Sequence, residues 1–479
     1  MRVPEGHVKW TEEVLPTTEA PIPPTPPTRR LPHRIASAER RAVAAVPVRD
    51  GRPHLPERRE PDEPEATWEP PVPKTWDALG LDPAVAEPIL LRLMLTTPRV
   101  SGRRVANELC VALRLVQDLM DRLKERKLVT HVGTDQVGDF ISQLTDEGRA
   151  KAIQSRKVTT YVGPLPVPFD QYLISVREQS LAKVAPGEAQ LKRAFHDLMI
   201  NDSMLDRLGP AITSSSPLFL FGDPGNGKTS IAERITRCYG VGMWIPHMLE
   251  IEGNLVSMYD PAIHKSRADA PSSRKTDRRW VHIDRPTIVA GGELTLDVLD
   301  LQVDEVTNVS ESPLQLKANG GTLVIDDFGR GRTPPKAILN RWIFPLEKKT
   351  DFLQLPDGRK VAVPFACQLV FSTNLEPRDL ADEAFFRRIP YKIMVGDPDP
   401  HEFGILVELL ARKMGIKLTH GSVKYLVERH YRMGERPMRF CHPRDLLLQV
   451  QHLCAYKRSP MVAGPDEWDA AIASYFGLQ

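Results

Sequence analysis

Long apolar runs, paired cysteines and a strong net charge are all missing from this sequence of 479 residues. No apolar run approaches the roughly 18 residues of a membrane-spanning helix, and the N-terminus lacks the apolar region of a signal peptide. The five cysteines are scattered without a C-x-x-C pair, which argues against a disulfide framework or a zinc site. A net charge of +2 gives no overall attraction to nucleic acid or anionic membrane. We therefore expect a cytoplasmic protein without a membrane-inserted segment.

Proline is concentrated near the N-terminus, where residues 1–75 hold sixteen of the 44 prolines among dense, mixed charges. Such a composition buries too little apolar surface to offset the entropy of ordering. We expect a disordered Pro-rich tail that is partly polyproline II and acts either as a tether or as a docking ligand for a partner. The remaining length predicts two or three domains.

Residues 76–156 have helical periodicity and then strand alternation. Asp82 precedes a first predicted helix, Ser101 caps a second, and a third extends over 112–127. Alternating strands are predicted at 128–132 and 140–144, with a final helix after them. Three helices followed by a hairpin resemble a winged-helix domain, which is a small α+β unit.

A winged-helix domain implies DNA as one partner, read by its third helix in the major groove. Residues 76–156 nevertheless hold twelve basic and eleven acidic side chains, and the third helix mixes both signs. A DNA-binding domain normally presents a basic face, since phosphate neutralisation supplies much of the affinity. A protein partner is favoured, and DNA stays open.

A glycine-rich loop with a lysine and a threonine follows the apolar run at residues 218–221 and matches the phosphate-binding pattern G-x-x-x-x-G-K-[ST]. Glycines let backbone N–H groups surround a phosphate, Lys228 reaches the β- and γ-phosphates, and the Thr229 hydroxyl ligates Mg²⁺. A helix predicted after the loop directs its N-terminal dipole at the phosphates. We expect a bound nucleoside triphosphate, with these loop residues: Gly222, Asp223, Pro224, Gly225, Asn226, Gly227, Lys228, Thr229 and Ser230.

Two later apolar strands end in polar residues suited to the same chemistry. Residues 320–325 lead into Asp326 and Asp327, a Walker B pattern in which the first carboxylate holds Mg²⁺ and the second orients the attacking water. Residues 368–373 lead into Asn374, which is placed to contact the γ-phosphate or that water. The sequence therefore predicts a magnesium-dependent nucleotide site.

Residues 160–475 resemble an AAA+ ATPase on these motifs together. The resemblance makes Asn374 the sensor 1 residue, Arg387 or Arg388 the arginine finger in the segment Ala384–Ile389, and Arg444 of Cys-His-Pro-Arg-Asp the sensor 2 residue. It implies ATP as the nucleotide, an α/β domain at 211–396 with a doubly wound parallel sheet, and an α-helical lid at 397–479. It also implies a ring, usually a hexamer, in which the finger reaches a neighbour's γ-phosphate.

One residue departs from the usual family pattern. The second Walker B acid is usually Glu, whereas Asp327 is one methylene shorter. The resemblance leaves three roles open. The protein remodels a protein client, acts with DNA as a loader, transposition helper or transcription activator, or serves as a scaffold timed by slow hydrolysis.

Several local patterns complete the sequence-based expectations. Residues 157–210 are predicted as linker and adaptor helices, with an extended apolar segment over the nucleotide-binding domain at 161–169 and helices near 171–185 and 188–207. Residues 265–279 are predicted as a mobile basic loop that either contacts nucleic acid or an acidic protein or is an ordinary solvated loop. Hairpins are predicted at 287–297 and, around an Asp-Gly turn, at 352–361.

Overall fold

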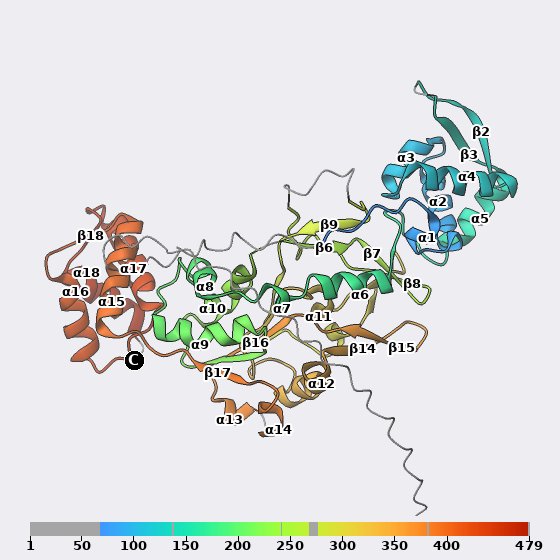
Figure 1. Ribbon diagram of the computed structural model, residues 1–479. Coiled ribbons are helices and arrows are strands. Elements are labelled where there is room, and N and C mark those ends of the chain that lie inside the picture. The colour runs from blue at the N-terminus through green and yellow to red at the C-terminus, as the bar shows by residue number, and fades with distance from the viewer. Residues whose placement is uncertain (1–67, 137, 241, 268–275, 381–382, 478–479) are drawn as a thin grey trace, which may run out of the picture. The chain divides into compact units, whose positions relative to one another are not determined.

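The computed structural model describes residues 68–136, 138–240, 242–267, 276–380 and 383–477 (Figure 1). Its contacts divide the chain into two units, Met1–Glu60 and Pro61–Gln479, and the first lies outside the described residues. The predicted disorder of residues 1–67 is therefore not addressed by the structure.

The last residues of the predicted tail make specific contacts. The rings of Trp68 and Trp280 meet edge to face, with centroids 5.2 Å apart. The backbone N–H of Asp277 donates to the carbonyl of Pro70 over 3.0 Å. The boundary of the predicted tail at residue 75 is therefore wrong, because an aromatic contact fixes residues that the proline content assigns to disorder.

A five-stranded parallel sheet forms the centre of the α/β domain, with the strand order β10-β13-β16-β5-β17. Each strand is a short apolar run, as expected for a parallel sheet that is buried on both faces. The strands are β10 (Thr287–Ala290), β13 (Thr322–Ile325), β16 (Gln368–Thr373), β5 (Leu218–Phe221) and β17 (Tyr391–Met394).

Helices cover both faces of this sheet, as the doubly wound prediction requires (Figure 1). Alternation along β5 places Leu218 and Leu220 in a core with α9 (Asp202–Thr213) and α10 (Lys228–Ile235). Phe219 points into the opposite core, which α12 (Pro335–Lys348) covers. Three short helices complete this domain: α11 (Leu314–Lys317), α13 (Pro377–Leu380) and α14 (Glu383–Phe386).

The hairpin predicted at 287–297 is wrong. Thr287–Ala290 instead form the edge strand β10, which pairs in parallel with β13 and buries Ile288 and Ala290. A four-residue β-branched run fits either setting, and only the non-local partner decides. The hairpin at 352–361 is confirmed, because β14 (Thr350–Gln354) pairs antiparallel with β15 (Lys360–Pro364) around the Asp-Gly turn.

A second body of strands lies mostly between α10 and β10 in the sequence, after the 3-10 turn η1 (Thr236–Tyr239). One sheet has the order β11-β12-β8-β7-β4, and β6 pairs separately with β9. The strands are β4 (Val167–Pro168), β6 (Met243–Pro246), β7 (Met248–Ile251), β8 (Asn254–Ser257), β9 (Trp280–Ile283), β11 (Gln302–Val303) and β12 (Ser310–Glu311).

The N-terminal domain is built from helices and a small antiparallel sheet of order β1-β3-β2 around one apolar core. Its third long helix, α4, buries Leu115, Leu119 and Leu123 along one face. The elements are α1 (Trp76–Leu79), α2 (Pro83–Thr96), β1 (Val100–Ser101), α3 (Gly102–Glu108), α4 (Leu113–Glu125), β2 (Val129–Thr134), β3 (Phe140–Leu144) and α5 (Asp146–Arg156).

The linker differs from its prediction in three places, one of which is that the helix predicted near 171–185 is divided into two. Tyr161 and Leu165 pack in the core of the N-terminal domain rather than over the nucleotide-binding sheet. The helix predicted at 188–207 is two helices, α8 (Glu188–Ala194) and α9, because Asn201 caps a new helix through the N–H of Met204. Before them come α6 (Phe169–Glu178) and α7 (Leu181–Val184).

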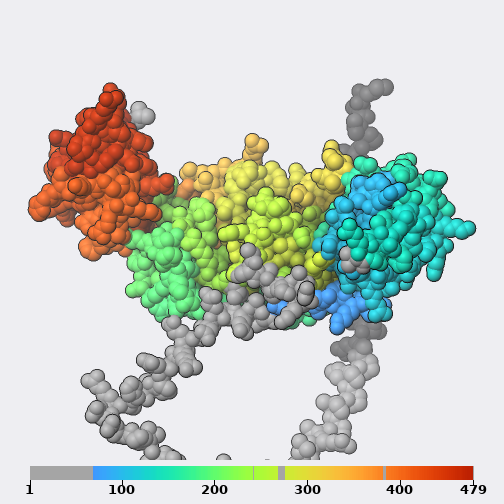
Figure 2. All heavy atoms as spheres, turned by 90° about the horizontal axis from the view of Figure 1, so that it is seen from above, coloured from blue at the N-terminus to red at the C-terminus, as the bar shows by residue number. Residues whose placement is uncertain are grey.

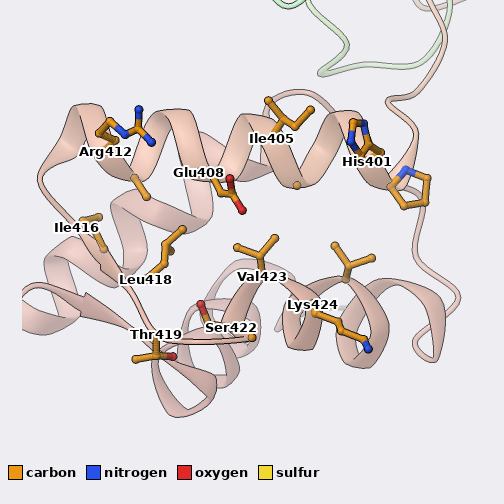
Figure 3. Close-up of a pocket in the computed structure, with 15 residues that line it drawn as sticks. His401, Ile405, Glu408, Arg412, Ile416, Leu418, Thr419, Ser422, Val423 and Lys424 are labelled. Carbon is orange, nitrogen blue, oxygen red and sulfur yellow. The ribbon is translucent and has the colours of Figure 1, made fainter.

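The C-terminal residues, orange to red in Figure 2, form a helical body with its own core. A groove of about 850 Å³ lies beside α15, where Glu408 points toward Val423 (Figure 3). The elements are α15 (Pro400–Met414), β18 (Lys417–Leu418), α16 (Ser422–Tyr425), the π-helix η3 (Leu426–Arg432), α17 (His442–Lys457), β19 (Val462–Ala463) and α18 (Pro465–Phe476). Within the described residues, no helix combines the length and apolar character needed to cross a bilayer.

The prediction of a basic loop at 265–279 needs correction for its described ends, because residues 268–275, with Arg274 and Lys275, lie outside the described residues. Arg267 pairs with Asp284, and Arg278 donates to the Ala106 carbonyl and the Asn107 side chain. The Arg279 side chain is 1% exposed and bonds within the protein. These guanidinium groups therefore have structural partners that sequence spacing does not reveal.

Arg279 joins three parts of the chain. Its guanidinium pairs with Asp277 at 2.8 Å and donates to the carbonyls of Pro166 at 3.0 Å and Leu79 at 3.4 Å. Removal of one partner of a buried ion pair leaves the other charge uncompensated, which typically costs about 3–5 kcal/mol. Arg279 thus fastens the N-terminal domain and the linker to β9.

We predict that Arg279→Met lowers the unfolding free energy by about 3 kcal/mol. Urea denaturation followed by tryptophan fluorescence measures this change, since Trp280 is adjacent. Lys265→Met, at a side chain that is 84% exposed, is the control and leaves the midpoint nearly unchanged. Equal midpoints for the Arg279 variant and the wild type contradict the assigned role.

Candidate nucleotide site

The glycine-rich loop connects β5 to α10, so the carboxyl end of a central strand leads directly to a helix N-terminus. Gly227 is the residue before α10 and has φ 81°, in the left-handed region that glycine adopts without strain. Gly225 has φ 86°, and a Cβ there lies 2.5 Å from the Cys441 sulfur. Backbone geometry and close packing therefore both require glycine in this loop. The N–H groups of the loop lie just before the N-terminus of α10, where the helix dipole favours anions.

The Lys228 ammonium group is held at the centre of the site. It donates to the carbonyls of Gly222 and Asp223, both at 2.9 Å, and to Oδ1 of Asn374 at 2.6 Å. Burial lowers the pKa of Lys228, whereas the carboxylates of Asp326, Asp327 and Asp223 act to raise it. A phosphate suits this cation as a ligand, because its negative charge stabilises the ammonium form that desolvation disfavours.

Thr229 and Asp326 lie side by side, because β13 and β5 both end at the carboxyl edge of the sheet. The Thr229 hydroxyl donates to Oδ2 of Asp326 over 2.8 Å. A hydroxyl next to a carboxylate fits Mg²⁺, which prefers oxygen ligands and completes its shell with waters and phosphate oxygens. Within the described residues, no group of three or more His, Cys, Asp or Glu side chains forms a separate metal site.

Asp327 and Asn374 extend the same cluster. Asn374 follows β16 and donates from Nδ2 to Oδ1 of Asp327 over 3.3 Å, while its own oxygen accepts from Lys228. Asp327 has φ 47°, an uncommon backbone conformation for a residue other than glycine. The structure therefore brings together Lys228, Asn374 and Asp327 from three separate segments.

The two predicted finger arginines lie beyond α14. Arg388 pairs with Glu347 of α12 at 3.1 Å and is half-buried. Arg387 is exposed. A role in a neighbouring subunit requires a side chain at the surface, and Arg387 meets that requirement better.

Arg439 of the C-terminal helical domain also contacts the loop, and sequence reasoning missed it. Its guanidinium donates to Asp223 of the loop at 2.6 Å and also to Asp397. The Asn226 amide donates to the same Asp397 at 2.6 Å. The predicted sensor 2 residue, Arg444, is exposed in the first turn of α17. No short motif marks Arg439, because its partners are distant in the sequence.

The backbone after Arg439 also lies against the loop. The N–H of Cys441 donates to the Gly225 carbonyl over 2.9 Å, and the N–H of Phe440 donates to Oδ1 of Asn226 over 3.4 Å. Residues 439–441 therefore hold the C-terminal helical domain against the glycine-rich loop.

Comparisons with protein families and with solved structures give the following similarities. A family model described as a domain of unknown function (DUF8689) matches residues 399–474. No curated protein matches the chain. Among solved structures, the chain is similar to NtrX from Brucella abortus in complex with ATP, with 14% identity, a TM-score of 0.37, and coverage of 66% of this chain and 64% of that chain. It is also similar to the Thermotoga maritima RuvB Holliday junction branch migration motor, with 13% identity, a TM-score of 0.32, and coverage of 62% and 72%.

The chain thus spans less than two thirds of the length of the NtrX chain. The family model covers only the C-terminal helical domain. We therefore derive the function of the site from its own residues.

His442, next to the residues that touch the loop, is buried among aromatic rings of the lid. The ring centroids of Phe476 and Tyr475 lie 5.3 and 5.6 Å from its own. Burial, and secondarily the Arg439 charge, lower the pKa of His442 to about 4 from an ordinary 6.5, against the opposing effect of Asp445 and Asp397. The folded C-terminal helical domain therefore favours a neutral imidazole at this position.

We predict that His442 makes the lid acid-sensitive. Between pH 6.5 and about 4, the unfolded chain binds a proton that the folded chain does not, so stability falls as the pH drops through this window. Thermal unfolding followed across this range for the wild type and His442→Phe measures the effect, and the variant has the shallower dependence. His420→Phe, at an exposed site, keeps the wild-type slope. Identical slopes for wild type and His442→Phe contradict a buried neutral imidazole.

Proposed function

We propose that this protein is an AAA+ ATPase that binds Mg·ATP at the loop between β5 and α10 and assembles into a ring, expected to be a hexamer, to remodel a protein client. The observation that carries the proposal is the contact chain from Lys228 through Asn374 to Asp327, next to the Thr229–Asp326 pair. A phosphate-binding cation, a metal-binding pair and a water-orienting carboxylate are the parts that phosphoryl transfer to water needs.

Each residue has a distinct task in this proposal. The loop N–H groups and Lys228 bind the β- and γ-phosphates, and Thr229 and Asp326 hold the metal ion, which neutralises phosphate charge. Asp327 orients the attacking water and accepts its proton. Asn374 fixes Asp327 on one side and Lys228 on the other, so it positions both groups without exchanging a proton itself.

The short side chain of Asp327 is a reason to expect slow ATP hydrolysis. Its side chain is shorter than the Glu of the usual pattern, and its Oδ1 already accepts from Asn374 at 3.3 Å. A water beyond that carboxylate must be positioned by something that moves Asp327 or closes the site, such as a neighbouring subunit or a client. Hydrolysis that depends on assembly follows from this geometry.

A DNA-associated ATPase is the second candidate, and the helix-and-hairpin arrangement at residues 76–156 supports it through its likeness to a winged helix. The charge balance of that domain does not favour it. The partners found for Arg278 and Arg279 also remove two cations from the predicted nucleic-acid loop. A protein client is therefore the better-supported partner, with a cytoplasmic location that accords with five free cysteines.

The phosphate-loop assignment predicts that Lys228→Ala weakens ATP binding by roughly tenfold to a hundredfold, since a charge-assisted hydrogen bond is worth about 1.5–3 kcal/mol. Fluorescence titration with a labelled ATP analogue in the presence of Mg²⁺ measures the affinity. Lys183→Ala, at a lysine that pairs with Glu178, is the control. Wild-type affinity for ATP in the Lys228 variant contradicts the phosphate-loop assignment.

The finger assignment predicts complementation between subunits. Arg387→Ala lowers turnover by about 10³-fold while ATP affinity is kept, because the charge that stabilises the transition state comes from the neighbour. Lys228→Ala retains its finger but loses its own site, so a mixture of the two variants regains part of the hydrolysis that neither has alone. Steady-state phosphate release measures it, with Arg388→Ala tested in parallel. A mixture that stays inactive, or loss of turnover in Arg388→Ala alone, contradicts the assignment to Arg387.

A further inference from the structure

A long acidic stretch leads from β10 towards the Walker B strand. Residues 286–316 contain six carboxylates and no lysine or arginine, in a chain whose 64 basic and 62 acidic residues are otherwise balanced. The flanking residues Arg285 and Lys317 end the stretch on both sides. The carboxylates are Glu293, Asp297, Asp300, Asp304, Glu305 and Glu311.

The middle of this stretch, residues 296–306, exposes aliphatic side chains between the carboxylates. It includes the 3-10 turn η2 (Asp297–Leu299) and β11, the edge strand of its sheet. Four aliphatic side chains are exposed here: Leu296 at 38%, Val298 at 37%, Val303 at 42% and Val306 at 80%. Residues 302–306 are exposed without interruption. We call residues 296–306 the acidic-aliphatic surface.

Part of the negative charge of this surface is uncompensated. Asp300 lies 3.7 Å from Arg341. Asp304 accepts from the N–H groups of Thr307 and Val306, which lower its pKa and hold it ionised without adding a cation. Among the ion pairs of the described residues, none involves Asp297 or Glu305. The surface therefore carries aliphatic side chains and carboxylates that face solvent.

The backbone connects this surface to the nucleotide site. Strand β10 ends at Ala290, whose carbonyl accepts from the N–H of Asp326 at 2.8 Å. The hydroxyl of Thr333 donates to the Leu294 carbonyl at 2.8 Å, which ties the segment after Walker B to the start of the stretch. Residues 158–160 approach from the other side, since Asn308 donates to the Val158 carbonyl.

We propose that the acidic-aliphatic surface binds an extended, cationic polypeptide segment of another protein. Carboxylates attract lysine and arginine side chains, and the exposed aliphatic groups give apolar contact with the side chains between them. β11 is the end strand of its sheet, a position at which an extended segment can add a strand, although the carbonyls of Val306 and Thr307 already accept from residues 159 and 160. Nucleic acid is disfavoured, because its phosphates meet carboxylates here. The inference concerns binding alone and holds whether or not the protein hydrolyses ATP.

Fluorescence anisotropy with the full chain tests this proposal at one fixed salt concentration. The probe is a short labelled peptide of alternating Lys and Val, compared with a peptide of alternating Glu and Val and with a duplex DNA. Only the cationic peptide is expected to bind saturably. Binding of the acidic peptide with equal affinity, or of the DNA alone, overturns the proposal.

Two matched double variants locate the binding. Asp297→Lys with Glu305→Lys is expected to weaken the cationic peptide by roughly tenfold, because attraction becomes repulsion at two exposed sites. Asp118→Lys with Glu125→Lys, at exposed positions of α4, makes the same change in net charge and leaves the affinity unchanged. Val306→Ser tests the apolar part and weakens binding without altering charge. Equal weakening by both double variants, or no weakening by the first, overturns the proposal.

Discussion

The ammonium group of Lys228 is the interaction on which the site depends. It is bound to two carbonyls of its own loop and to Asn374, so it joins the loop after β5 to the end of β16. Asn374 in turn donates a hydrogen bond to Asp327 at the end of the neighbouring strand. The parallel register makes the chain of contacts possible, because Phe221, Ile325 and Thr373 all end their strands at the same edge. A change in the position of Lys228 therefore affects Asp327, the carboxylate that is proposed to orient the attacking water.

The same loop carries the C-terminal domain. Asp223 and Gly225 of the loop accept from Arg439 and from the backbone of Cys441. Asp397, which receives Arg439 and Asn226 together, lies between β17 and α15 and so at the entry to the lid. In the proposed function, triphosphate charge beside Arg439 would compete with Asp223 and Asp397 for one guanidinium. This competition would give the C-terminal helical domain an electrostatic reason to change its contacts.

Local chemistry explains which parts of this arrangement the sequence predicted. The loop glycines, Lys228 and Thr229 are contiguous, and the carboxyl ends of parallel strands must share an edge, so Asp326 and Asn374 could be placed near them. Arg439 could not, since its partner Asp223 is far away in the chain and no spacing rule links them. The predictions for Arg279 and for strand β10 were wrong for the same reason. A guanidinium on a loop and a β-branched run each have several possible partners, and tertiary packing selects among them.

The stretch after β10 has both buried and exposed apolar side chains. Leu294 and Leu299 are buried and hold the stretch against the α/β domain, so its exposed face is not simply unfolded apolar chain. Val306 and Val303 nevertheless face solvent among carboxylates. A cationic partner resolves both features at once, because it covers the aliphatic groups and neutralises Asp297 and Glu305. Since Ala290 of β10 accepts from the backbone N–H of Asp326, the stretch that would bind such a partner begins beside the carboxylate proposed to hold the metal ion.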